Sequence, residues 1–352
     1  MEAATVPATA AAPRQRLQEF VGKYGLIILL LALPVGFAIH DLVATGSLVR
    51  LGENLVAGLS NGAIWALVAI GYTLVYGIVE LINFAHGEVF MIGSFTAASF
   101  FATIGLTTAT GTVGLFFGLA LTLIVCMVAS GMLNVMIERV AYRPLRNAPK
   151  LAPLITAVGF SFILQNVGIL WKGGSPQGIP DLINSQHEVF SIFGVTISNG
   201  DLLALGVTIP LLFVMTAFIA RSRLGKAMRA TAQDPEAARL MGINVDTTIS
   251  LTFLIGGMLA GAAGLIYALY QTTIWYFQGF TAGLVAFTAA VMGGIGNVQG
   301  AVLGGVIIGT IQQISDNRIK PEWTPAIVFF YLILIMVFKP SGLLGEQTRE
   351  AG

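Results

Sequence analysis

Long apolar runs with few charged residues occupy most of this 352-residue chain. A membrane-spanning helix needs about 20 mainly apolar residues. Only 10% of the residues are charged, against about 25% in soluble domains. The sequence therefore predicts an all-α, polytopic membrane protein with roughly ten membrane segments, some of them short or broken. These segments are 26–44, 55–79, 89–104, 112–137, 151–171, 201–220, 247–270, 280–292, 301–314 and 324–338.

The basic residues indicate an orientation for these segments. Cytoplasmic loops of membrane proteins carry an excess of Lys and Arg. With the N-terminus in the cytoplasm, the 18 basic residues fall inside except Arg50, Lys172, Arg318 and Lys320. This distribution favours an N-in, C-in topology.

The same pattern divides the chain into a membrane domain and its flanks. We expect residues 1–23 to be a disordered cytoplasmic tail, because residues 1–12 are rich in Ala and Thr. Residues 24–345 would form the transmembrane domain, with a polar periplasmic segment at 172–200. Residues 346–352 would form a second cytoplasmic tail.

Several functional classes are disfavoured by composition and spacing. The net charge is +1, so the chain as a whole has no strong positive electrostatic field that would attract nucleic acid. The chain has one cysteine, Cys126, and three histidines without metal-ligand spacing, so neither a disulfide within the chain nor a metal site is expected. We find no nucleophile–base arrangement and no phosphate-binding loop. The sequence thus predicts neither an enzyme nor a cofactor.

One polar stretch, residues 77–93, lies between two apolar runs and stands out from them. It contains Glu80, Asn83, His86 and Glu88 together with three glycines. Ionisable groups at membrane depth cost about 2.5–3.5 kcal/mol each on insertion scales. We therefore predict a broken or hairpin-like element that lines a protected polar path. A purely structural role as a helix-end cap is an equal alternative.

A second loop of this kind, 293–300, joins two short apolar runs that could be paired half-helices or tightly packed spans. Aromatic residues flank the first break and could line an apolar route or belong to the core. Glycine-rich breaks in related halves of a transporter often mark its binding site. The predicted path or helix-break residues are Tyr72, Tyr76, Asn83, Phe84, His86, Glu88, Gly294 and Asn297.

The segment 224–242 contains signals for a short helix outside the membrane. Asp234 is a good N-cap, Pro235 suits the first helical position and Gly242 suits the C-terminal stop. We predict a helix over 235–241, which is too short to be stable alone. It is either a solvated interfacial helix or a coupling helix that docks into a motor subunit.

A family resemblance rests on several stretches of sequence. Residues 236–242, Glu-Ala-Ala-Arg-Leu-Met-Gly, resemble the Glu-Ala-Ala-x-x-x-Gly core of ABC importer permeases. The wider match, over about 55–345, resembles the H-type permease subunit of the Liv branched-chain amino-acid ABC importers. It is carried by Ala-Ile-Gly-Tyr-Thr-Leu-Val-Tyr-Gly-Ile at 69–78, Ile-Asn-Phe-Ala-His-Gly-Glu at 82–88, Glu-Arg-Val-Ala-Tyr-Arg-Pro-Leu-Arg at 138–146 and Phe-Thr-Ala-Ala-Val-Met-Gly-Gly-Ile-Gly at 287–296.

The resemblance implies a multi-subunit machine in the bacterial inner membrane. Its other parts would be a second related permease, two ABC ATPase subunits that hydrolyse ATP, and a periplasmic substrate-binding protein. The implied ATPase-coupling residues are Asp234, Glu236, Ala237, Ala238, Arg239 and Gly242. The expected cargo is a branched-chain or related amino acid.

Two alternatives stay open at this point. The cargo could be urea, a short amide or another small solute. The chain could also be a stand-alone, gradient-driven transporter with Glu80, His86 and Glu88 as a relay. The basic residues Arg139, Arg143 and Arg146 are interpreted as anchors for anionic membrane lipid or for an ATPase.

Overall fold

The computed structural model describes residues 13–146, 148–149 and 151–345, and this part of the chain is mainly helical. Ten longer helices correspond to the ten predicted segments, and two short helices lie between the sixth and seventh of them. The helices are α1 (Pro13–Thr45), α2 (Val49–Val79), α3 (His86–Thr103), α4 (Thr112–Ile137), α5 (Leu151–Lys172), α6 (Asn199–Arg221), α7 (Arg223–Gln233), α8 (Pro235–Leu240), α9 (Val245–Gln271), α10 (Gln278–Gly293), α11 (Val298–Arg318) and α12 (Thr324–Phe338).

Within the described residues, eight of these helices are long and apolar enough to cross a membrane. This confirms the predicted all-α, polytopic membrane fold. The remaining two of the ten are α3 and α10, and α10 is a short apolar helix of 16 residues. By contrast α11 has 21 residues, so it is not the half-helix that was considered for 301–314.

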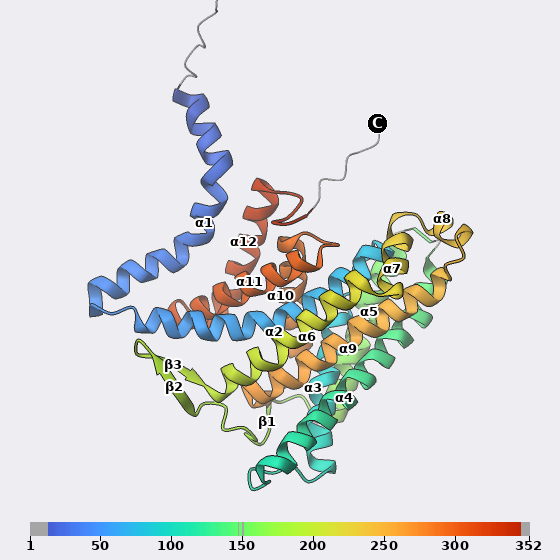
Figure 1. The fold of residues 1–352 in the computed structure, drawn as a ribbon, viewed down its shortest axis with the longest axis horizontal. Helices are drawn as coiled ribbons and strands as arrows, with labels where there is room; N and C mark the ends of the chain where they lie inside the picture. The colour runs from blue at the N-terminus through green and yellow to red at the C-terminus, as the bar shows by residue number, and fades with distance from the viewer. Residues whose placement is uncertain (1–12, 147, 150, 346–352) are drawn as a thin grey trace, which may run out of the picture.

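The structure differs from the sequence-based expectation at the N-terminal flank. Helix α1 begins at Pro13, so residues 13–23 are helical where a tail was expected. An amphiphilic run of good helix formers there simply extends the apolar helix that follows. Residues 1–12 and 346–352 lie outside the described part. Helix α1 contains Pro34 and bends along its length (Figure 1), as expected where a ring removes a backbone donor.

The polar segment 172–200 contains short strands. These are β1 (Gln177–Gly178), β2 (Glu188–Ile192) and β3 (Val195–Ser198). Strands β2 and β3 form an antiparallel hairpin, and β1 pairs with β4 (Thr273–Ile274) after α9. These small sheets join loops at one end of the bundle.

The core is built on close contacts between helices through small residues. Glycines on α2 and α11 face one another: a Cβ added at Gly309 would lie on the backbone of Gly62, and one at Gly58 would contact Thr310. Gly257 and Gly261 of α9 lie in the same way against α4. Without a hydrophobic driving force between helices in lipid, close backbone approach is the main source of packing energy. Helices α2 and α9 are accordingly the most buried spans.

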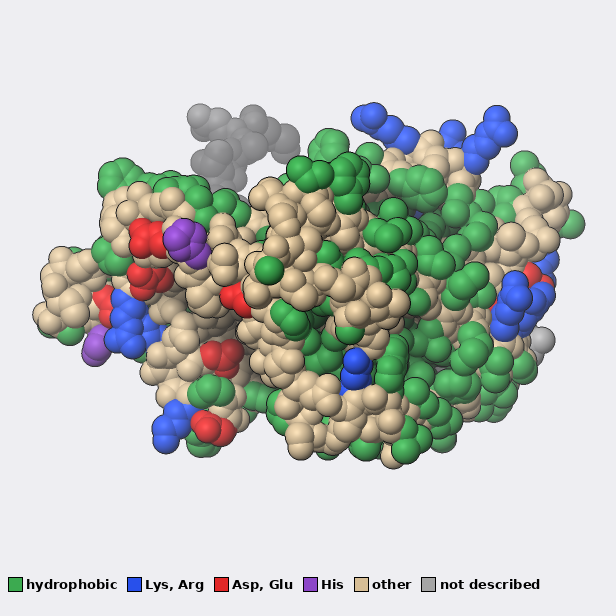
Figure 2. Space-filling view, turned by 90° about the horizontal axis from the view of Figure 1, so that it is seen from below, with side chains coloured by type: hydrophobic (Ala, Val, Ile, Leu, Met, Phe, Trp, Pro, Cys, Tyr) green, Lys and Arg blue, Asp and Glu red, His purple; other side chains and the backbone are tan. Residues whose placement is uncertain are grey.

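The two ends of the bundle differ. Helices α7 and α8 lie at one end, and the β2–β3 hairpin lies at the other (Figure 1). On the face shown in Figure 2, charged side chains gather mainly toward these two ends, and hydrophobic side chains cover much of the surface toward the end with α8. We call the end with α7 and α8 the basic end, because Arg223, Lys226, Arg229 and Arg239 lie on these two helices.

Candidate translocation path and coupling helix

The polar stretch predicted from the sequence forms a turn between α2 and α3. Glu80 ends α2 in a left-handed conformation with φ of 52°, and its N–H donates to the carbonyl of Tyr76 at 2.8 Å. The chain then leaves helical geometry until α3 begins at His86. The backbone break therefore lies where the cluster of Glu, Asn, His and Gly residues indicated it.

Asn83 is held inside this turn by hydrogen bonds to two other helical elements. Its Nδ2 donates to Oδ1 of Asn134 on α4 at 3.1 Å, and its Oδ1 accepts from the Tyr142 hydroxyl at 3.3 Å. Asn134 in turn donates to the carbonyl of Phe253 on α9 at 2.6 Å. These contacts favour a structural role for Asn83, as a clamp between α4, α9 and the turn.

His86 and Tyr72 form a buried aromatic pair. Their rings meet edge to face with centroids 4.8 Å apart, and the imidazole is fully buried beneath Gly71. A Cβ at Gly71 would collide with the ring, so glycine is needed for this close approach. The pair fixes the start of α3 against the last third of α2.

Glu88 is fully buried between three helices. Its Oε1 accepts hydrogen bonds from Ser161 at 3.1 Å and Gln165 at 2.9 Å, both on α5. Its Oε2 has no hydrogen-bond partner among the described residues and faces Gly279 at the start of α10. A carboxyl in this position binds α5 to α3 and leaves one oxygen directed at α10.

Two of the predicted path residues, Tyr72 and Tyr76, lie at a small cavity close to both breaks. Tyr72, Tyr76 and Ile82 line an apolar cavity with Phe287 and Ala290 of α10, and Ile295 of the α10–α11 turn completes it. Phe84 lies against Phe287, with ring centroids 6.2 Å apart. The cavity measures about 10 Å³, which is room for one water molecule. The cavity has no room for a larger solute in the conformation described.

Gly294 and Asn297 form the turn beside this cavity. Gly294 ends α10 with φ of 107°, a backbone conformation that strongly favours glycine. Asn297 caps α11 by accepting from the N–H of Gly300 at 3.0 Å, and its Nδ2 donates to the carbonyl of Leu344 at 2.7 Å. Both residues thus have a local structural function, and neither residue lines the cavity.

A second set of buried polar contacts was not predicted from the sequence. It lies between α2 and the helices α6 and α11: Ser60 donates to Asp201 at 2.7 Å, and Asn61 donates to Gln313 at 2.8 Å. One turn further along α2, Trp65 donates to Gln312 at 2.9 Å. Polar residues within otherwise apolar runs were the available signal. Their partners, more than a hundred residues away in sequence, were not predictable.

Helix α8 matches the helix predicted between spans. Asp234 caps it by accepting from the N–H groups of Glu236 and Ala237 at 2.9 and 3.0 Å. Ala238 is buried against the bundle, whereas Leu240 and Met241 are 89% and 83% exposed. Glu236, Ala237 and Arg239 are exposed as well, and Gly242 ends the helix with φ of 82°. The helix is anchored on one side and presents its tip to the outside.

Comparisons with known proteins decide the family. Residues 54–337 match the family described as "Branched-chain amino acid transport system / permease component". This chain belongs to that family. The chain is 42% identical over 300 residues to the high-affinity branched-chain amino acid transport system permease protein BraD of Pseudomonas aeruginosa, covering 85% of this chain and 97% of BraD. It is 40% identical over 303 residues to the permease protein LivH of Salmonella typhimurium, covering 85% and 96% respectively.

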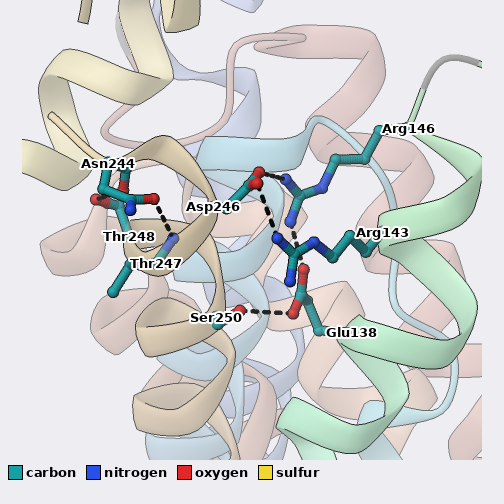
Figure 3. A network of polar contacts seen from close by, with 8 residues as sticks. All are labelled: Glu138, Arg143, Arg146, Asn244, Asp246, Thr247, Thr248 and Ser250. Carbon is teal, nitrogen blue, oxygen red and sulfur yellow. Dashed lines mark hydrogen bonds and ion pairs between the residues drawn. The ribbon is translucent and has the colours of Figure 1, made fainter. Parts of the chain in front are cut away.

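This permease also has an ion-pair network near α8, between the end of α4 and the start of α9 (Figure 3). The buried Glu138 binds Arg146 through Oε1 and accepts from Ser250 through Oε2 at 2.7 Å. Asp246 binds Arg146 at 2.5 Å and Arg143 at 2.9 Å. The network connects the 138–146 segment to the helix that directly follows the α8 loop.

Proposed function

We propose that this permease is the transmembrane subunit of an ATP-driven importer of branched-chain amino acids in a bacterial inner membrane. Its partners would be a second related permease, two ABC ATPase subunits that hydrolyse the ATP, and a periplasmic substrate-binding protein. The names of its relatives support the cargo. The observation that carries the coupling role is the projecting helix α8, with Leu240 and Met241 almost fully exposed.

The physical chemistry of α8 favours a docking function. The helix has six residues, and an isolated helix of this length is marginal in water. The Asp234 cap and the buried Ala238 hold it in place, so its geometry is formed before any partner binds. Two exposed apolar side chains beside Glu236 and Arg239 gain from burial in a complementary groove. The basic end would accordingly face the cytoplasm, where the ATPases bind.

The closed cavity at the α2–α3 turn supports a path between α10 and the pair α2 and α3. A Cβ at Gly87 would lie on the backbone of Gly279 and Gly283, so α3 and α10 touch without intervening side chains. A contact without interlocking side chains permits one helix to shift against the other. In this account ATPase closure moves α10, which opens the space beside Tyr72 and Phe287 for the apolar side chain of the substrate.

Two substitutions, one in α8 and one at Gly242 just after it, test the coupling role. Glu236→Ala removes the exposed carboxylate, and Gly242→Val forces a β-branched residue into positive φ at the helix end. We expect both variants to insert normally but to lose ATP-driven leucine uptake and to retain less ATPase subunit on purification. The matched control is Glu188→Ala, which removes one exposed carboxylate at the opposite end of the bundle. Wild-type uptake and ATPase retention in both variants would refute the assignment.

A further inference from the structure

A surface groove of about 690 Å³ lies between the basic ends of α4 and α9. One wall is formed by α4 and by the π-helical turn η1 (Glu138–Tyr142) that continues it, and the other wall by the first turns of α9. Neither the translocation path nor helix α8 includes this groove. Its outer face is open, because Met132 and Val140 are more than half exposed.

The two walls change from apolar to polar in the same direction. Along α4 the lining residues are Met132 and Met136, followed by Arg139 in the π-helical turn. Along α9, which runs back from the basic end, the order is Asp246 and Ser250, followed by Leu254. The groove is therefore polar at the basic end and apolar toward the middle of the bundle on both sides. This arrangement fits a molecule with a polar head and an apolar tail.

The charges at the polar mouth favour an anionic head. Arg139, Arg143 and Asp246 line the mouth, and Asp246 is paired with Arg143 and Arg146. The buried Glu138 is paired with Arg146 and does not line the groove. Arg139 is exposed on the same rim and forms no hydrogen bond or ion pair with any described residue. One positive charge therefore remains unbalanced. Its planar guanidinium can bind a phosphate oxygen pair.

We propose that this groove is a specific binding site for one anionic phospholipid. The phosphate binds Arg139 with support from Arg143, and one acyl chain follows the methionine and leucine side chains between α4 and α9. The inference goes beyond the transport role and does not depend on the cargo. Asn244 caps α9 at the mouth of the groove and lies two residues after Gly242, where the α8 loop ends. The lipid therefore also contacts the segment that bears the coupling helix.

The experiment measures lipid retention by the purified full-length permease with native mass spectrometry in neutral detergent. The probes are dioleoyl phosphatidylglycerol and dioleoyl phosphatidylcholine. The test variant is Arg139→Gln, and the matched control is Arg221→Gln, which removes an exposed arginine at the end of α6 that forms no hydrogen bond or ion pair with the described residues. Glycerol phosphate is added as a competitor without a tail.

The expected result is one phosphatidylglycerol retained in preference to phosphatidylcholine. Affinity should fall about fivefold in Arg139→Gln, the factor expected for one basic residue at an anionic lipid surface, and should be unchanged in Arg221→Gln. An equal loss of phosphatidylglycerol affinity in both variants would show non-specific electrostatic attraction and would overturn the site. Displacement of the lipid by glycerol phosphate alone would overturn it as well. Loss of the lipid when the second permease binds would assign the groove to that subunit instead.

Discussion

The ion-pair network around Glu138 allows a quantitative prediction, because it contains both a buried and an exposed ion pair (Figure 3). Glu138→Ala removes a fully buried carboxylate and leaves Arg146, 18% exposed at its side chain, with one carboxylate partner in place of two. Ser250 loses its acceptor at the same time. Breaking a buried pair costs about 3–5 kcal/mol. Since Asp246 still compensates Arg146, we expect a loss near the lower limit, about 3 kcal/mol.

Arg143→Ala tests the exposed branch of the network. The side chains of Arg143 and Asp246 are 47% and 43% exposed, so their ion pair is worth about 0–1 kcal/mol. Ser250→Ala removes only the hydroxyl that donates to Glu138 and should lower the unfolding free energy by about 1 kcal/mol. The assay is reversible unfolding of the purified permease in neutral detergent, with the four proteins compared at one salt concentration. A loss for Arg143→Ala equal to or larger than that for Glu138→Ala would refute the reasoning.

Three further predictions concern packing, hydrogen bonding and capping. Gly309→Ala should lower the unfolding free energy by about 1–3 kcal/mol, because the new methyl meets the backbone of α2. The control is Gly206→Ala, where no heavy atom lies within 4 Å of the added Cβ, and it should not lower the free energy in the same unfolding titration. Asn134→Ala removes the partner of Asn83 and the donor to Phe253, and should cost about 2 kcal/mol in that titration; a neutral result would contradict the clamp. Asp234→Ala should speed amide hydrogen exchange of the first turn of α8 about fivefold, and an unchanged rate would contradict the cap.

Elements defined by local chemistry were predictable from the sequence. The ten longer helices were predicted from runs of apolar residues, and eight of them are long and apolar enough to cross a membrane. The start and end of α8 follow from Asp234, Pro235 and Gly242, each of which acts within a few residues of its position. The turn at Asn83 was indicated because polar and glycine residues interrupt an apolar run. In each case the signal and its structural effect lie in the same short stretch.

Contacts between distant segments were not predictable in this way. Asn61 and Gln313 are 252 residues apart, and Asp41 and Arg318 are 277 apart, yet both pairs form hydrogen bonds. A single sequence shows that each residue is polar in an apolar context but does not show which helices are neighbours. The same limit applies to Glu88, whose partners on α5 depend on how α3 and α5 pack.

Leucine transport by a reconstituted system tests the central claim most directly. Uptake of radiolabelled leucine would be measured in proteoliposomes with the permease alone, and with a second permease, the ATPases and the binding protein, each with and without ATP. We predict uptake only in the complete, ATP-containing system. Uptake by the permease alone, driven by a proton gradient, would contradict the account and would make Glu88 and His86 candidates for a proton relay.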